Sequence, residues 1–399
     1  MKNNDPDQIN QVLTRGVAEV LPGKKSLAEL MQKKKIRLYL GIDPTGAFLH
    51  IGHGVVLRKL QQFAELGHEV ILLVGNGTVK IGDPTGRDKS RPVLTDEQIE
   101  ANFQDWKRQA STILDFDKIE VRHNGDWLEK LSYSDIVKLL AKTTVQQLLE
   151  RDMFQERMKK ELPIFGHEII YPMLQGYDSV VMDVDLELGG TDQTFNMMMG
   201  RTLQKAYNNH EKWVLTVPLL EGTDGRKMSK SFNNYIALTD TPNDMFGKLM
   251  SIQDELICRY FKILTDVPTE EIEAMQQAMQ SGENPMQFKQ KLAWTITSDF
   301  HGDEAADQAQ QHFATAFKQG KTPEDVPEVK IKENPIQLLK LLTLCMPEQS
   351  VSQLRRLIQQ GAIKLMPEEE KLTDFDLQFE VENGQVLKVG KRKFFKLIS

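Results

Sequence analysis

The chain has 399 residues and a formal net charge of −7, with 50 Lys and Arg residues against 57 Asp and Glu residues. A chain of this length holds two or three domains, each long enough to bury a core of its own. The acidic balance excludes a protein coated in basic residues, so any contact with nucleic acid must come from local patches. The N-terminus lacks an apolar signal core and no apolar run is long enough for a membrane span, which predicts a cytoplasmic protein without membrane contact.

Strand-like runs alternate with helical patterns in the first half of the chain, at residues 37–42, 69–75, 180–188 and 213–220. This alternation is typical of an α/β protein with a parallel sheet of the Rossmann type. A long segment between the second and third runs repeats apolar residues near helical spacing, at Ile99, Phe103, Trp106, Ile113 and Leu114. It predicts a mostly helical insertion, which either covers the sheet or carries a subunit interface.

The segment His50-Ile51-Gly52-His53 follows the first expected strand and opens an amphipathic helix that ends at Gly67. Both histidines then lie on the first helical turn and share a face. The unpaired N–H groups and partial positive charge of a helix start suit phosphate oxygens. Gly52 removes the side chain between the histidines, so a base or a ribose can approach the backbone closely. Taken alone, this segment is ordinarily two surface histidines on a helix.

A second segment, Lys227-Met228-Ser229-Lys230-Ser231, follows the turn-forming run 222–226. Lysines in such a loop can reach the phosphates of a bound triphosphate. A charge-rich loop by itself is ordinarily solvated surface. The two segments together, in this order, indicate a protein that handles ATP.

A helical pattern follows from residue 243 to about 317, and a charged, proline-bearing stretch after it is typical of a linker. Next comes a short helix at 350–358 with adjacent arginines, Arg355 and Arg356. The last segment, 386–399, is strand-like, with five basic residues and no acidic one. In an acidic chain, such a basic segment indicates a local surface that binds phosphates. Its basic residues are Lys388, Lys391, Arg392, Lys393 and Lys396.

The two cysteines, Cys258 and Cys345, match neither the spacing of a metal site nor a disulfide framework. Two buried thiols in a reducing compartment are the preferred interpretation. No other segment spaces potential ligands as a metal site would, so no dedicated protein metal site is expected.

The two motifs resemble the signatures of class I aminoacyl-tRNA synthetases, and further segments resemble tyrosyl-tRNA synthetases. Residues 39–45 resemble that family's strand before the first motif, 171–178 its amino-acid-binding helix, and 189–193 its ribose-contacting turn. These segments occur in the family's order, and the similarity covers most of the chain.

The resemblance implies a fold and a set of domain boundaries. We expect a Rossmann-type catalytic domain, an α-helical domain on the anticodon side of tRNA, a linker and a small α+β RNA-binding domain. Their expected bounds are 1–235 with a dimerising insertion at about 93–165, then 236–320, 321–335 and 336–399.

The implied reaction activates L-tyrosine with ATP to tyrosyl-adenylate and pyrophosphate, then transfers tyrosine to the 3′ end of tRNA(Tyr). The attacking carboxylate is ionised at neutral pH, so the first step needs no general base. It needs positive charge and hydrogen-bond donors around the phosphate oxygens. Mg²⁺ is expected with ATP, carried mainly by the phosphates. The resemblance also implies a homodimer formed through the insertion.

The residues that the resemblance assigns to catalysis are Thr45, His50, His53, Lys227 and Lys230. The residues that it assigns to ATP are Asp43, Gly52, Asp192, Gln193, Lys230 and Ser231. Those assigned to tyrosine are Tyr39 and Asp178 at the phenolic hydroxyl, and Asp83, Tyr171 and Gln175 at the ammonium group.

Selectivity for tyrosine would follow from the hydroxyl-binding pair, Tyr39 and Asp178. A site built to hydrogen-bond a hydroxyl rejects the analogue without one because its polar groups stay unpaired, and tyrosyl-tRNA synthetase is itself the standard case of this principle. Glu187 stands where many relatives of this family carry Gln, and it is assigned no role.

The C-terminal stretch resembles a small RNA-binding module first seen in a ribosomal protein and found at the end of many bacterial tyrosyl-tRNA synthetases. The likeness is clearest at residues 355–361 and 389–393, whereas 364–371 lacks the Asn-Gly hairpin expected there. The tRNA contacts that this likeness implies are Arg355, Arg356, Lys391, Arg392 and Lys393.

Three alternatives stay open at this point. A tryptophanyl-tRNA synthetase shares the fold and both motifs, but gives no reason for the pair Tyr39 and Asp178. A nucleotidyltransferase of small metabolites also uses the first motif, but leaves the second motif and the C-terminal module unexplained. A catalytically inactive relative that only binds RNA would not need the intact histidines and lysines of both motifs.

Overall fold

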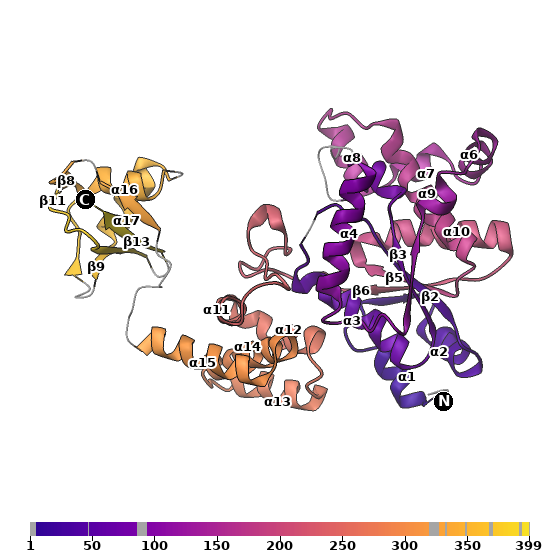
Figure 1. Cartoon of the computed structure of the whole chain (residues 1–399), viewed down its shortest axis with the longest axis horizontal. Helices are drawn as coiled ribbons and strands as arrows, with labels where there is room; N and C mark the ends of the chain where they lie inside the picture. Colours follow the sequence, from indigo (N-terminus) through magenta and orange to yellow (C-terminus); the bar gives the residue numbers. More distant parts are fainter. Residues whose placement is uncertain are drawn as a thin grey trace. The chain divides into compact units, whose positions relative to one another are not determined.

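The computed structural model describes residues 5–46, 48–85, 94–318, 327–331, 333–347, 349–366, 370–390 and 393–398. The chain divides into two compact units, Met1–Asp307 and Gln308–Ser399, coloured by sequence in Figure 1. Among the residues described, no helix is long and apolar enough to cross a membrane.

A six-stranded sheet forms the centre of the first unit, in the order β1-β6-β5-β2-β3-β4 (Figure 1). Strands β2 to β6 run parallel to their neighbours, and β1 pairs antiparallel with β6. The predicted Rossmann-type sheet is therefore confirmed. The strands are β1 (Glu19–Leu21), β2 (Arg37–Ile42), β3 (Glu69–Val74), β4 (Ile119–His123), β5 (Leu186–Gly190) and β6 (Trp213–Val217).

The third predicted strand starts too early. Residues 180–182 belong to helix α9 (Gly166–Met182), which ends at Asp183 with a left-handed φ of 47°, and β5 begins only at Leu186. The apolar run Val180-Val181-Met182 fits a buried helix end as well as a strand, and periodicity cannot separate the two. Strand β4 was not predicted because it is an edge strand whose Glu120 and Arg122 form an ion pair instead of an apolar face.

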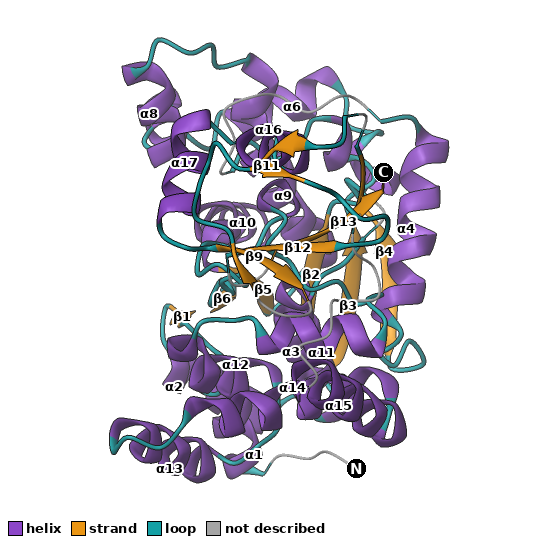
Figure 2. Cartoon of the chain, turned by 90° about the vertical axis from the view of Figure 1, so that its left-hand side faces the viewer, coloured by secondary structure: helices purple, strands orange, loops and turns teal. Residues whose placement is uncertain are grey.

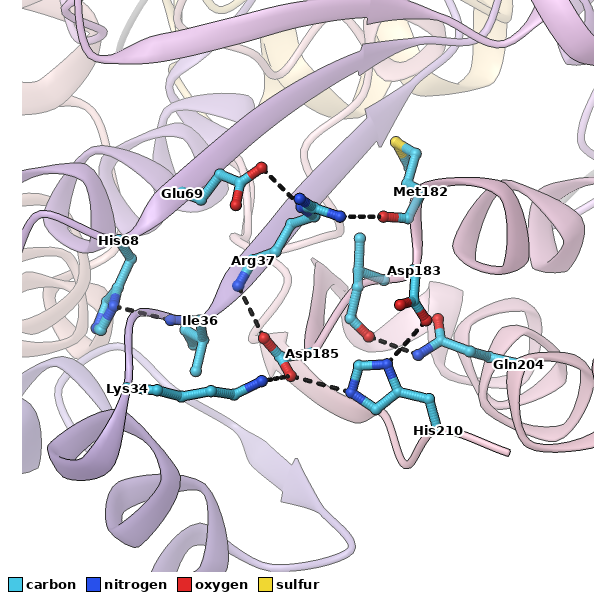
Figure 3. Close-up of polar contacts among 11 residues, drawn as sticks. Lys34, Ile36, Arg37, His68, Glu69, Met182, Asp183, Asp185, Gln204 and His210 are labelled. Atoms are coloured by element: carbon cyan, nitrogen blue, oxygen red, sulfur yellow. Dashed lines mark hydrogen bonds and ion pairs between the residues drawn. The ribbon is translucent and has the colours of Figure 1, made fainter. Parts of the chain in front are cut away.

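The amino ends of β2 and β5 are tied together by one buried carboxylate, Asp185 (Figure 3). Its Oδ1 accepts from Nζ of Lys34 at 2.7 Å and lies 3.1 Å from Nε2 of His210, and its Oδ2 accepts from the backbone N–H of Arg37 at 2.9 Å. These contacts fix where both strands begin. Since the strands are parallel, they also fix where the carboxyl ends come to lie.

Helices cover the sheet and fill the insertion. Helix α10 packs closely on α9, because a Cβ at Gly176 would lie 3.0 Å from the backbone nitrogen of Gly200. The helices before α11 are α1 (Pro6–Val12), α2 (Lys24–Lys33), α3 (Ile51–Glu65), α4 (Asp96–Ala110), α5 (Gly125–Leu128), α6 (Tyr133–Leu140), α7 (Val145–Leu149), α8 (Asp152–Lys159), α9 and α10 (Thr194–Asn208). Short 3₁₀ turns are η1 (Thr78–Lys80), η2 (Thr191–Gln193) and η3 (Lys230–Phe232).

The predicted helical segment after the lysine loop is present. It consists of α11 (Pro242–Met250), η4 (Asp254–Leu256), α12 (Ile257–Leu264), α13 (Thr269–Gln280), α14 (Pro285–His301) and α15 (Asp303–Lys318). Figure 2 shows α12, α13 and α14 at the same end of the first unit as α1. Helix α15 crosses from the first unit into the second.

The second unit is a small α+β body. Its five-stranded sheet has the order β10-β9-β12-β13-β7, and a two-stranded ribbon pairs β11 with β8. The elements are β7 (Glu328–Lys330), β8 (Ile336–Gln337), α16 (Leu338–Cys345), α17 (Val351–Gln359), β9 (Ile363–Met366), β10 (Glu370–Lys371), β11 (Gln378–Phe379), β12 (Val386–Val389) and β13 (Lys393–Ile398).

Strand β7 lies inside the segment 321–335 that was expected to be a linker. It pairs in parallel with β13, with Leu397 opposite Val329. Part of the expected linker thus contributes a strand to the C-terminal sheet. A three-residue strand flanked by charges has too short a pattern to be recognised in the sequence. The remaining domain boundaries stay predictions.

Candidate active site

A cavity of about 880 Å³ opens at the carboxyl ends of β2, β3 and β5, where ligands bind in open α/β sheets. Segments far apart in the sequence meet on its wall. The predicted site residues found there are Asp43, Thr45, His50, His53, Asp83, Tyr171, Gln175, Asp178, Asp192, Gln193, Lys227 and Lys230. Two predicted residues, Tyr39 and Gly52, are not on this wall, and the side chain of Ser231 lies outside what the structure describes.

The two histidines of the first motif sit at the start of α3. His50 is the N-cap residue, its backbone N–H donates to Nδ1 of His53 at 3.2 Å, and the ring centroids are 3.8 Å apart. Burial, with Lys230 and Lys227 nearby, lowers the pKa of His50 to about 4. Burial also lowers the pKa of His53 well below its usual value. Both imidazoles are therefore neutral near pH 7.

The missing side chain of Gly52 also serves the packing of the two motifs. A Cβ at this position would lie 2.9 Å from Nδ1 of His50 and 3.5 Å from Sδ of Met228. The missing side chain thus makes room for the His50 ring and for the lysine loop. The predicted close approach of a base or a ribose to the backbone at Gly52 stays a prediction.

The lysine loop is fixed at its base by Asn234. The backbone N–H of Ser229 donates to Oδ1 of Asn234 at 2.8 Å, and Met228 is buried. Nζ of Lys227 lies 2.9 Å from Oδ2 of Asp192 across the cavity mouth. Nζ of Lys230 lies 5.7 Å from the centroid of the Phe48 ring, and burial lowers the pKa of Lys230. Two cations therefore flank the opening near the histidines.

Asp178 lies on the cavity wall with two neutral donors behind it. Its Oδ2 accepts from Nδ2 of Asn124 at 3.1 Å, and its Oδ1 accepts from Nε1 of Trp127 at 2.8 Å. Burial raises the pKa of Asp178, and these two hydrogen bonds act in the opposite direction. The carboxylate is held in one orientation, with lone pairs left to accept from a ligand.

Tyr39 is fully buried behind this wall, and its hydroxyl oxygen lies 3.0 Å from Oγ of Ser179. Asp178 is among the charges that raise the pKa of the Tyr39 hydroxyl, so the two side chains lie in the same region. Their joint contact with a phenolic hydroxyl stays a prediction.

Carboxylates and amides gather at another part of the wall. Oη of Tyr171 donates to Oδ2 of Asp43 at 2.9 Å, and Nε2 of Gln193 donates to Oδ2 of Asp83 at 2.8 Å. Nε2 of Gln175 donates to Oε1 of Glu187 at 3.1 Å. Anionic and acceptor groups such as these suit a ligand that carries a positive charge.

Several residues of the site were missed in the sequence. Asn124 and Trp127 follow β4, which the pattern did not predict, so nothing marked them. Lys212 precedes an apolar strand, where a lysine usually indicates the surface. Glu187 carried the one available signal, because it departs from the usual residue of the family.

The residues assigned to tRNA lie in the second unit and are only partly described. Arg355 and Arg356 are exposed on α17, and the guanidinium carbon of Arg355 lies 5.4 Å from the centroid of the Phe375 ring. Lys393 is the first residue of β13. Lys391 and Arg392 lie outside the described residues.

Comparison with known proteins identifies relatives over nearly the whole chain. The family model "tRNA synthetases class I (W and Y)" matches residues 31–318. The chain is 43% identical over 394 residues to a tyrosine–tRNA ligase of Thermotoga maritima, covering 98% of both chains. It is 44% identical over 393 residues to that of Moorella thermoacetica, covering 97% of this chain and 95% of the relative.

Solved structures share the fold. The tyrosyl-tRNA synthetase of Archaeoglobus fulgidus complexed with L-tyrosine superposes with a TM-score of 0.62 at 22% identity, covering 77% of this chain and 100% of the other. A C-terminally truncated mitochondrial tyrosyl-tRNA synthetase of Aspergillus nidulans gives a TM-score of 0.64 at 21% identity, covering 78% and 94%. With the full-length relatives, these matches establish that the chain belongs to the tyrosine–tRNA ligases, within the class I tRNA synthetases of the W and Y type.

Proposed function

We propose that the cavity of the first unit activates L-tyrosine with ATP and that the chain then transfers tyrosine to tRNA(Tyr). The observation that carries this proposal is the meeting of both motifs and the acidic, amide-bearing wall around one cavity. Membership of the tyrosine–tRNA ligases sets aside the tryptophan enzyme and the nucleotidyltransferase. Both motifs also keep their histidines and lysines on the cavity wall, as an active enzyme requires.

In the first step, a carboxylate oxygen of tyrosine attacks the α-phosphorus of ATP and pyrophosphate leaves. Neutral His50 and His53, with Thr45, would offer uncharged donors to the phosphate oxygens. Lys227 and Lys230 would supply positive charge as negative charge moves to the leaving group. Asp192 and Gln193 would contact the ribose and the adenylate. Alignment of the two substrates can contribute roughly 7 to 11 kcal/mol, so no side chain needs to act as a nucleophile.

The tyrosine substrate would lie with its ammonium group at Asp83, Tyr171 and Gln175. Its phenolic O–H would donate to the Asp178 carboxylate, which the two donors behind it hold in place. The hydroxyl of Tyr39, which lies 3.0 Å from Oγ of Ser179, could also contact the phenol, because a phenolic O–H can donate one hydrogen bond and accept others. Asp178 and Tyr39 together would distinguish tyrosine from phenylalanine.

Mg²⁺ would accompany ATP, with the phosphates as its principal ligands. Within the described part of the chain, no group of three His, Cys, Asp or Glu side chains is placed to hold a metal ion. The lysines of the second motif would neutralise phosphate oxygens directly, and the neutral histidines of the first motif would donate hydrogen bonds to them. The bound ion would shield additional charge on the triphosphate.

Two surfaces are proposed to bind macromolecules. The basic residues of the C-terminal module, Arg355 and Arg356 with Lys391, Arg392 and Lys393, would contact tRNA, and the helices α11 to α15 would lie on its anticodon side. The insertion would form a homodimer. It carries exposed apolar side chains on α6, α7 and α8 and on the segment between α8 and α9, and Figure 1 shows these three helices at one end of the first unit. These residues are Tyr133, Val137, Val145, Met158, Leu162 and Phe165.

Large exposed apolar patches ordinarily mark an interface. Sedimentation equilibrium should therefore give a dimer, and Phe165→Asp should shift it toward monomer. Location in the cytoplasm stays a prediction.

The test of the activity is exchange of labelled pyrophosphate into ATP, run with each of the twenty amino acids and without tRNA. Exchange with tyrosine alone is the expected result. Exchange with tryptophan would overturn the assignment of the pocket, and no exchange with any amino acid would overturn the proposed reaction.

A further inference from the structure

A buried lysine, Lys212, lies behind the amino-acid part of the cavity, and the proposed reaction does not use it. Its side chain is fully buried, and its Nζ contacts Oε2 of Glu187 on β5 and, at 2.7 Å, Oγ of Ser179 on α9. Nζ also lies 5.7 Å from the centroid of the Tyr39 ring. Burying an ammonium group costs free energy, which only well-placed partners can offset. Here each of the two partners also contacts a residue assigned to tyrosine binding: Glu187 contacts Gln175, and Ser179 contacts Tyr39.

The fold leaves a space for this ammonium group at Gly200 of α10. A Cβ at Gly200 would collide with Nζ of Lys212 and would lie 2.7 Å from Oγ of Ser179 and 3.3 Å from Oε2 of Glu187. The three polar groups therefore occupy the volume that any larger side chain would fill. A substitution that adds a side chain at Gly200 would therefore disturb these three polar groups without removing a charge.

The first branch of the network leads through Glu187 to Gln175, and both residues lie on the cavity wall. Oε1 of Glu187 accepts from Nε2 of Gln175 at 3.1 Å. A carboxylate can only accept, so it selects the NH₂ side of the Gln175 amide and leaves the amide oxygen to accept from a substrate. Glu187 stands where many relatives carry Gln, and the ammonium group of Lys212 compensates its charge.

The second branch leads through Ser179 to Tyr39. An ammonium group can only donate, so Oγ of Ser179 accepts from Lys212 and keeps its own proton for another partner. The hydroxyl of Tyr39, 3.0 Å away, is the partner in this structure. One buried cation therefore contacts the hydrogen-bond partners of both Gln175 and Tyr39.

We propose that Lys212 is a positioning residue for the amino-acid pocket, acting through Glu187 on Gln175 and through Ser179 on Tyr39. Lys212 does not touch the substrate; it determines which atom of Gln175 is available to receive the ammonium group of tyrosine. The inference rests on the proposed function, because it takes Gln175 to be that receiving group.

The experiment measures tyrosine-dependent and ATP-dependent pyrophosphate exchange for Lys212→Met and Gly200→Ala, together with thermal denaturation of each variant. Both substitutions should raise the KM for tyrosine about tenfold, the scale expected for a disturbed hydrogen bond to a charged group. The KM for ATP should stay within about twofold of the wild-type value, because the network does not reach the motif residues. Gly200→Ala keeps every charge and displaces the end of Lys212 together with its contacts at Ser179 and Glu187, so it disturbs the same network and decides the question if Lys212→Met fails to fold.

Lys59→Met is the matched control. Lys59 is also buried, but its Nζ donates to the carbonyls of Val12 and Arg15 and to Oε1 of Gln62, away from the pocket. Its loss should change the melting temperature and leave the KM for tyrosine unchanged. A rise in that KM equal to the rise in Lys212→Met would show a general effect of losing a buried lysine and overturn the inference.

The double variant Lys212→Met/Glu187→Gln separates positioning from stability. It removes both charges, so thermal stability should recover relative to Lys212→Met, whereas the KM for tyrosine should stay raised because an amide at position 187 can present either atom to Gln175. Recovery of both properties would make the pair purely structural, and an unchanged KM for tyrosine in Gly200→Ala would also overturn the inference. A wild-type enzyme without tyrosine-dependent exchange would instead refute the proposed function.

Discussion

The two units of this chain use charge in opposite ways. Every charged side chain that is buried among the described residues belongs to the first unit, including Lys212, Glu187 and Asp178. The described core of the second unit is apolar, built from residues such as Leu338, Leu354 and Leu387, and its arginines on α17 are exposed. The buried charges of the first unit are held at fixed distances by their partners. None of the described charges of the second unit is buried, and some form ion pairs at the surface, such as Lys396 with Glu328.

This difference predicts two kinds of response to substitution. Loss of a buried, paired charge leaves its partner unsatisfied, so the effect is large and specific to one substrate. Loss of an exposed basic residue removes part of a screened electrostatic attraction, so the effect is smaller and depends on salt. The four predictions below test this contrast, from the largest expected effect to the smallest.

Lys230→Ala should lower the rate of adenylate formation about 10²- to 10³-fold, the range typical of a lost group that stabilises transition-state charge. Tyrosine binding should survive, because Lys230 lies at the mouth of the cavity beside Phe48. Single-turnover kinetics measure the rate, and equilibrium dialysis measures tyrosine binding. Lys205→Ala is a suitable control, since that ammonium pairs with Glu211 instead of lining the cavity. An unchanged rate in Lys230→Ala would remove this lysine from the site.

Asp178→Ala should lower kcat/KM for tyrosine about 10- to 100-fold and affect phenylalanine much less, because only tyrosine loses a hydrogen bond to the carboxylate. The ratio of the two kcat/KM values in pyrophosphate exchange is the measurement. Equal losses for both amino acids would show that Asp178 only supports Asn124 and Trp127.

A chain that ends at Lys318, the last residue of α15, should activate tyrosine at nearly the wild-type rate but charge tRNA with a KM about tenfold higher. This end point removes β7 together with β13, whereas an end near Pro335 would leave β7 without its partner. Charging assays at two salt concentrations give the measurement. The wild-type KM should rise more steeply with salt than that of the shortened chain, and identical salt dependence would contradict a role for the module in tRNA binding.

Lys59 should make the stability of the first unit depend on pH. Burial lowers its pKa to about 7 in the folded protein, below the value of 10.5 of a free lysine. The unfolded chain therefore binds more protons between these values, and the free energy of unfolding should rise as pH increases from about 7 to about 10. A fall in the pKa from 10.5 to about 7 corresponds to at most about 5 kcal/mol. The change should be smaller, because three acceptors and the C-terminal end of α1 favour the ammonium.

Thermal denaturation of wild type and Lys59→Met across this pH range isolates that contribution. The melting temperature of the wild type, relative to that of Lys59→Met, should increase as pH rises. A difference that stays constant with pH would show that Lys59 remains charged throughout.

Much of the first unit could be predicted from the sequence because its signals are local. The alternation of strands and helices predicted β2, β3 and β6, and the two short motifs predicted residues that meet on the wall of one cavity. The position of β5 was predicted poorly, because Val180 to Met182 suits a helix end and a strand equally. The network around Lys212 could not be predicted, because it joins residues from α9, β5 and the start of β6 that meet only in the folded chain.

The second unit gave weaker signals. The clustered basic residues pointed to the arginines of α17 and to strand β13. Strand β7 was interpreted as linker, because three residues are too few to show an alternation of apolar and polar side chains. Strand β7 is positioned by β13, more than sixty residues later in the chain, where Leu397 lies opposite Val329. Non-local pairing of this kind leaves no trace in a single sequence.

The pairing of β7 with β13 also sets an order of events during synthesis. β7 is the earliest strand of the C-terminal sheet and β13 the latest, and β13 lies between β12 and β7. While the ribosome is still extending the chain, domains fold as they emerge, so the first unit can become compact early. The sheet of the second unit must wait until residues as far as Ile398 have left the exit tunnel. A nascent chain would therefore possess a formed cavity in its first unit before it possesses a formed second unit.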